Sequence, residues 1–127
     1  VWVEHFRQIE TGISHSAKAT QLQPDLAEAW FCHGRVLMLT GQYIQATEML
    51  EQGWSLGAVG MRSQVTAAVW LGESYGILGD VPRCQEWLQQ AVCLTDKWLK
   101  HNPAVAHYWQ GRARQALGGI PRAKHVC

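Results

Sequence analysis

Residues 30–50 read WFCHGRVLMLTGQYIQATEML, and the spacing of small and large residues in this segment recurs along the chain. The series consists of Gly34, Leu37, Gly41, Ala46 and Leu50. Thirty-eight positions later stand Gly72, Tyr75, Gly79, Cys84 and Leu88, and a further 39 positions on stand Gly111, Arg114, Gly118 and Ala123. Small residues align with small ones over both steps, which indicates an internal repeat.

The glycines of this repeat predict where helices touch and where they end. Glycine inside a helix costs about 1 kcal/mol relative to alanine, so Gly34, Gly72 and Gly111 imply the close approach of a second helix. Gly41, Gly79 and Gly118 lie where a helix must stop and reverse, because glycine readily adopts the left-handed backbone conformation. The sequence therefore predicts helices that pack in pairs.

Two segments carry a recognisable form of this pattern. They are Trp30-x-x-His33-Gly34-x-x-Leu37-x-x-x-Gly41-x-Tyr43-x-x-Ala46-x-x-x-Leu50 and Leu71-Gly72-x-x-Tyr75-x-x-x-Gly79. The pattern resembles the tetratricopeptide repeat (TPR) family, over most of the chain from about Ala19 to Ala123. The resemblance implies an all-α fold, a TPR-type solenoid of antiparallel helix pairs with about two full repeats plus flanking helices.

On this basis we expect a single TPR-like domain over residues 1–127. Its parts are a helix of a preceding repeat (1–23), a first repeat (26–56), a second repeat (62–100) and a third, incomplete or capping repeat (104–127). The expected helices cover residues 3–22, 26–39, 42–55, 62–78, 81–100 and 104–117, and residues 120–127 would begin another. Asp80 is a predicted N-cap. Because the chain opens at Val1 and not at Met, we expect it to be part of a longer protein.

The third repeat departs from the family pattern at His107, Gln110 and Arg114, where large apolar residues are usual. Its apolar stripe is predicted to be Trp109, Ala113, Ala116 and Leu117. The last element of a solenoid needs a polar outer face, so this helix is either a cap or is covered by a partner or by further chain.

Composition excludes several classes of function. A net charge of +1 gives no field that would recruit nucleic acid or an anionic membrane, and the longest apolar runs are far shorter than a membrane span. The 4 cysteines show no CxxC pair, and we expect reduced thiols in a cytoplasmic protein. The 6 histidines show no metal-ligand spacing, and we expect His33 to be a partly buried, hydrogen-bonded packing residue.

No catalytic or cofactor motif is present, so we expect a non-catalytic protein without cofactors. The first helices of stacked pairs line a concave face, which predicts a peptide groove. Its candidate residues are Glu28, Phe31, Arg35, Met38, Thr66, Trp70, Glu73, Ile77, Tyr108, Trp109 and Arg112, with Cys32 and Leu39 in the same stripe. The aromatic members, with arginine and glutamate between them, would form an exposed track of the kind found in binding hot spots. Trp70 and Trp109 would be core residues instead if the helical register were one position off.

These features favour a protein–protein interaction scaffold that holds an apolar or mixed partner peptide or helix. The alternative is a regulatory or positioning TPR module of a larger enzyme or assembly factor. An RNA-binding helical repeat is disfavoured by the low net charge, and self-association through the last helix remains open. TPR proteins that bind acidic chaperone tails use polar donors on the groove helices, and here only Arg35 keeps one, so a carboxylate clamp is not expected.

Overall fold

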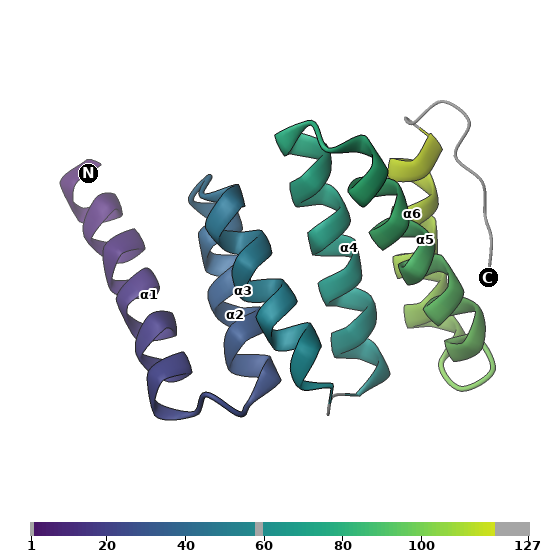
Figure 1. The fold of residues 1–127 in the computed structure, drawn as a ribbon, viewed down its shortest axis with the longest axis horizontal. Coiled ribbons are helices and arrows are strands. Elements are labelled where there is room, and N and C mark those ends of the chain that lie inside the picture. The colour runs from purple at the N-terminus through teal and green to yellow at the C-terminus, as the bar shows by residue number, and fades with distance from the viewer. Residues whose placement is uncertain (1, 58–59, 119–127) are drawn as a thin grey trace. The chain divides into compact units, whose positions relative to one another are not determined.

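The computed structural model describes residues 2–57 and 60–118, and α-helices make up most of this part of the chain (Figure 1). The helices are α1 (Trp2–Leu22), α2 (Ala27–Leu39), α3 (Tyr43–Leu56), α4 (Met61–Leu78), α5 (Val81–Trp98) and α6 (Pro103–Gly118). No strand occurs in these ranges. The prediction of an all-α fold is therefore confirmed.

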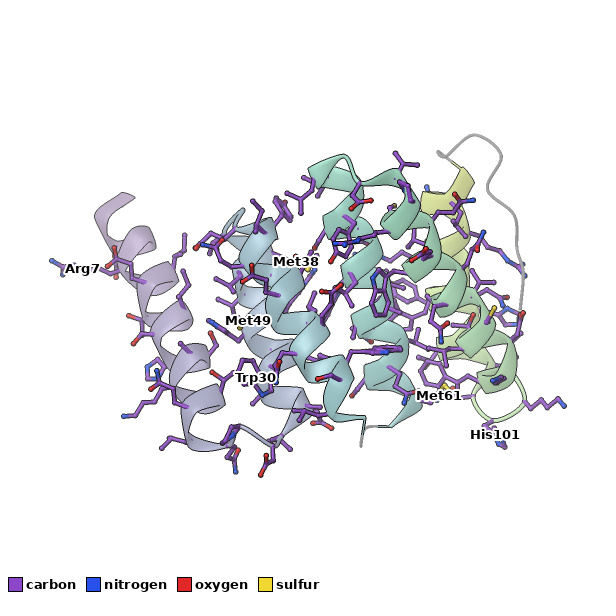
Figure 2. The ribbon with its side chains drawn as sticks, viewed as in Figure 1. Arg7, Trp30, Met38, Met49, Met61 and His101 are labelled. Carbon is purple, nitrogen blue, oxygen red and sulfur yellow. The ribbon has the colours of Figure 1, made fainter. Side chains whose placement is uncertain are left out.

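The helices form two compact units, residues 1–58 and 59–127. In the first unit α2 packs against both α1 and α3, and in the second α5 packs against α4 and α6, while α4 also touches α6. Short turns make consecutive helices within each unit antiparallel (Figure 1). In the turn before α2, the indole Nε1 of Trp30 (labelled in Figure 2) donates a hydrogen bond of 2.9 Å to the carbonyl of Pro24.

Two glycines bring paired helices into close contact, as the sequence predicts. A methyl group added to Gly34 would lie 2.7 Å from Leu50 Cγ, and one added to Gly72 would lie 2.5 Å from Leu88 Cγ. Both leucines are fully buried. Gly34 with Leu50 and Gly72 with Leu88 are thus the same helix contact made twice, 38 positions apart.

The ends of α2 and α4 are also built alike. Gly41 and Gly79 adopt the left-handed conformation, with φ of 82° and 84°. In each case the next residue returns a hydrogen bond to the helix, from Gln42 N–H to Leu37 O at 2.8 Å and from Asp80 N–H to Tyr75 O at 2.9 Å. The predicted cap at the start of α5 is confirmed, because Asp80 Oδ1 accepts a hydrogen bond of 3.2 Å from the Arg83 N–H.

The helix boundaries differ from the predicted ones mainly after α5. This helix ends at Trp98 and not at residue 100, and a turn over residues 99–102 leads to Pro103 at the start of α6. The predicted helical start over 120–127 lies outside the described residues.

The buried stripe of α6 matches the predicted one at Ala113 and Leu117 but not at Trp109 and Ala116. Ala106, Gln110, Ala113 and Leu117 are buried, whereas Trp109 and Ala116 are only half-buried. Gln110 can occupy a buried position because its amide donates a hydrogen bond to Asp96 on α5. Gly111 was predicted to touch a second helix, but a methyl group added there would meet no atom of another helix within 4 Å in the described part of the chain.

The cysteines differ in state. Cys32 is an exposed free thiol, Cys84 is a buried free thiol, and Cys93 is disulfide-bonded. The expectation of reduced thiols is therefore wrong for Cys93, and for Cys127 it lies outside the described residues. Burial raises the pKa of the Cys84 thiol, with smaller contributions from Asp80 and Glu73, so Cys84 is a core residue at the position of Ala46.

Two further properties bear on function. None of the described helices has both the length and the apolar character required to cross a membrane. Across residues 2–57 and 60–118, no cluster of three or more His, Cys, Asp or Glu side chains could hold a metal ion.

Candidate interaction surface

Most of the predicted groove residues lie in the second unit, on two helices that touch. Four residues at positions i, i+4, i+7 and i+11 share one face of α4, and three neighbouring residues lie on α6. We call this set the α4–α6 surface: Thr66, Trp70, Glu73 and Ile77 on α4, with Tyr108, Trp109 and Arg112 on α6. All seven are among the groove residues predicted from the sequence, and α4 and α6 are in contact.

An ion pair joins the two helices at the centre of this surface. Arg112 donates two parallel hydrogen bonds to the Glu73 carboxylate, from Nε to Oε1 at 2.8 Å and from the terminal Nη2 to Oε2 at 3.0 Å. The side chains are 33% exposed for Arg112 and 24% for Glu73. This fork-to-fork geometry fixes the orientation of the guanidinium as well as its charge.

Aromatic rings of α6 complete the surroundings of Arg112. Its guanidinium carbon lies 5.3 Å from the centre of the Trp109 ring, a cation–π distance, and the Tyr108 ring meets Trp109 edge-on at 5.3 Å. Burial by itself would lower the pKa of Arg112, but the hydrogen bonds and the charge of Glu73, with a smaller contribution from Tyr108, outweigh it and raise the pKa. Arg112 therefore stays a cation that is held on two sides.

Around this pair the surface exposes uncharged groups. Ile77 is 60% exposed and Tyr108 is 61% exposed. Thr66, Trp70 and Trp109 are half-buried, so the two tryptophans are neither core residues nor fully open to solvent. Chemically, the arrangement offers apolar and aromatic contact area beside a neutralised charge pair.

The groove residues predicted on α2 belong to the first unit, and two of them are not exposed. Phe31 is 4% exposed and Met38 (labelled in Figure 2) is 6% exposed, which corrects the prediction that they face a groove. Both share one buried stripe of α2 with Ala27 and Gly34. The reason is visible at Phe31, whose ring occupies the space that a side chain at Gly53 of α3 would need.

The exposed stripe of α2 keeps Glu28 and Arg35 and has Cys32 and Leu39 in place of Phe31 and Met38. Its members are Glu28, Cys32, Arg35 and Leu39, of which Arg35 is half-buried and the others are exposed. Adding 38 to these numbers gives Thr66, Trp70, Glu73 and Ile77, the face of α4 in the α4–α6 surface. Cys32 and Leu39 were in the stripe that the sequence predicted, but they were not among its binding candidates.

Tyr108 is exposed, although the residues at the corresponding positions of the other two helices are buried. It stands at the position of Phe31 on α2 and Val69 on α4, both of which are buried. On α6 the same position is open, because no helix of the described chain packs on that side, as the empty space at Gly111 also indicates. This position is therefore buried in the first two repeats and exposed in the third.

His33 is a packing residue, as predicted. It is 9% exposed, and a hydrogen bond of 2.6 Å joins its Nδ1 to Ser16 Oγ on α1. Burial lowers the pKa of His33, so the neutral imidazole is favoured. Ser16 Oγ also donates a hydrogen bond of 3.0 Å to the carbonyl of Ile13 on its own helix, so its bond with His33 is the one that links α1 to α2.

The comparisons with known proteins add no assignment. No protein-family model matches the chain, and no curated protein matches it.

Proposed function

We propose that this chain is a non-catalytic protein-interaction module whose α4–α6 surface holds a partner peptide or helix. The observation that carries the proposal is the exposure of Ile77 and Tyr108 on either side of the Glu73–Arg112 pair. Exposed aromatic and aliphatic side chains around an ordered arginine have the composition of binding hot spots. A surface pre-arranged by a bidentate ion pair also loses less side-chain entropy when a partner binds.

The underlying architecture is proposed to be a TPR-type solenoid of helix pairs. Support comes from the repeated contact of Gly34 with Leu50 and of Gly72 with Leu88, and from the matching helix ends at Gly41 and Gly79. In such an array the first helices of successive pairs present their exposed stripes on one side. α4 and α6 would be two such first helices, which is in keeping with their direct contact.

The proposal is tested by peptide selection followed by affinity measurements. A random peptide library displayed on phage is selected on the purified chain, and enriched peptides are synthesised with a fluorescent label. Fluorescence polarisation then compares the wild type with Ile77→Ser and Tyr108→Ala. We expect each substitution to weaken binding roughly tenfold or more, because each removes a central apolar contact.

The matched control is Ile44→Ser. Ile44 on α3 is 62% exposed, so it equals Ile77 in residue type and exposure but lies outside the α4–α6 surface. We expect it to leave the affinity essentially unchanged. The proposal would be refuted if Ile44→Ser and Ile77→Ser lowered the peptide affinity equally. It would also be refuted if the selection gave no peptide that binds the purified chain in solution.

A further inference from the structure

We propose that Glu73 sets the specificity of the α4–α6 surface by occupying the hydrogen-bonding fork of Arg112, so that the surface rejects carboxylates and accepts an uncharged, largely apolar peptide segment. This inference rests on the proposed function for the existence of a peptide partner. It adds the chemical class of that partner and a residue that selects it.

The first step concerns the donors of Arg112. A guanidinium has five N–H donors, and it binds a carboxylate best through two parallel ones. Here Nε and Nη2 already bind the two oxygens of Glu73, at 2.8 and 3.0 Å. The guanidinium carbon also lies 5.3 Å from the centre of the Trp109 ring. A carboxylate from a partner would therefore find the Nε–Nη2 edge filled, and it could approach only the Nη1–Nη2 edge, beside the carboxylate of Glu73.

The second step concerns charge. Glu73 and Arg112 neutralise each other, and the other members of the α4–α6 surface are threonine, isoleucine, tyrosine and two tryptophans, all uncharged. An incoming carboxylate would approach within a few ångströms of Glu73, where like charges repel, and the pair is only 24–33% exposed, so solvent screens it incompletely. An acidic ligand thus loses solvation without gaining a free cation.

The third step identifies what the surface can still bind. The N–H groups of Arg112 that bind neither Glu73 nor Tyr108 can donate to neutral acceptors such as backbone carbonyls or side-chain amides. Ile77 and Tyr108, both at least 60% exposed, offer contact area to apolar side chains. Charge complementarity therefore selects a neutral segment with apolar side chains, whose backbone carbonyls reach Arg112.

The test removes the charge of Glu73 and keeps its shape. The probes are the labelled pentapeptide Gly-Leu-Glu-Leu-Glu with a free C-terminus, and the neutral Gly-Leu-Gln-Leu-Gln amide. We expect Glu73→Gln to bind the acidic probe at least about tenfold more tightly than the wild type, since Arg112 becomes available. The neutral probe should change by less than about threefold. The double variant Glu73→Gln/Arg112→Gln should lose the gain.

Glu86→Gln is the matched control. Glu86 is an exposed glutamate on α5 of the same unit, so its substitution changes the net charge equally without touching Arg112. We expect no gain in affinity for the acidic probe. A gain equal to that of Glu73→Gln, or no gain with Glu73→Gln, would overturn the proposal.

A second measurement does not depend on peptide binding or on the stability of the variant. In the wild type, the NMR signal of the Arg112 Nε–H is followed while sodium acetate is added at constant ionic strength. We expect no saturable shift, because Glu73 holds the fork, and a saturable shift would overturn the specificity rule even if no library peptide were found. Conversely, selected peptides that need Ile77 and Tyr108 would preserve the proposed function if the acetate result went against Glu73.

The remaining candidate occupant is a second copy of the chain. Light scattering over a range of concentrations decides this. We expect a mass that does not depend on the α4–α6 surface. A dimer that Ile77→Ser and Tyr108→Ala both dissociate would place a second copy there and refute the choice of a separate peptide segment.

Discussion

Single glycines determine how closely the helices of each pair approach. At Gly72 the missing side chain leaves room for Leu88, whose Cγ would lie only 2.5 Å from an added methyl group. Leu88 is fully buried and has little room to move. The contact therefore requires glycine at position 72, because any side chain there would collide with Leu88.

We predict that Gly72→Ala destabilises the protein by about 1–3 kcal/mol, because overpacking in a close helix contact outweighs the better helix propensity of alanine. The control is Gly111→Ala at the corresponding position of α6, where the added methyl group meets nothing within 4 Å. That substitution should stabilise by roughly 0.5–1 kcal/mol. Urea unfolding followed by circular dichroism measures both, and substitutions that shifted the midpoint in the same direction would contradict the packing argument.

We predict a pH dependence of stability that comes from His33. Burial lowers its pKa in the folded state, so the unfolded chain, with an imidazole pKa near 6.5, takes up the proton first as the pH falls. The stabilising effect of the neutral imidazole is complete above about pH 6.5 and is lost progressively below it. The melting temperature should thus fall between pH 7.5 and 5, and His33→Gln should reduce this fall.

His101→Gln serves as the control for that series. His101 is exposed and extends from the turn after α5 (Figure 2). This variant should keep the pH dependence of the wild type. If His33→Gln behaved like His101→Gln, the buried imidazole would not be the source of the effect.

For single residues, the sequence predicted the roles that only a few residue types can take. It did not predict which of two adjacent residues on a helix faces the solvent. Gly34, Gly72 and the cap at Asp80 were identified because few residues can take those roles. Phe31 was assigned to the exposed face, whereas Cys32 lies there. Adjacent residues differ by about 100° around a helix, and an aromatic side chain suits both a core and a binding surface.

At the level of the helices, the ion pair between Glu73 of α4 and Arg112 of α6 was not predicted from the sequence. Glu73 and Arg112 were both predicted as groove residues, but their pairing depends on the level at which two helices lie side by side. The same holds for Gln110, which is buried because Asp96 on α5 accepts its hydrogen bond. Hydrophobic periodicity describes one helix at a time, so it does not predict which side chains of two helices form a pair.

We predict that the Glu73–Arg112 pair contributes to holding α4 against α6. A double-mutant cycle with Glu73→Gln and Arg112→Gln should give a coupling of about 0.5–1 kcal/mol in the free energy of unfolding, a value kept modest by the partial exposure of both groups. The coupling should decrease in high salt. A control cycle that pairs Glu86→Gln with Arg112→Gln should give no coupling, and equal values from the two cycles would exclude a direct interaction.

Helix ends were predicted well where a glycine, a proline or an aspartate marks them. α2 and α4 end at the predicted residues before left-handed glycines, and Asp80 caps α5. α5 ends two residues before its predicted end because no such residue marks its C-terminus, and the apolar Leu99 continues the pattern past Trp98. Boundaries are therefore accurate to the extent that local chemistry specifies them.

For the molecule as a whole, the repeat was the most informative property of the sequence. Residues aligned 38 and 39 positions apart predicted the helices after α1 with nearly correct limits. The same alignment relates the exposed stripe of α2 to that of α4. Each unit thus presents a face of the same design, with different side chains on it.

The exposed thiol of Cys32 occupies the place on α2 that Trp70 occupies on α4. The thiol of Cys84, by contrast, is buried and its pKa is raised, so it should react slowly with alkylating reagents. An environment-sensitive dye attached to Cys32 would therefore report, without any mutation of α2, whether a peptide contacts the exposed stripe of the first unit. The stretch of a peptide that makes this contact could be found by trimming the peptide until the dye no longer responds.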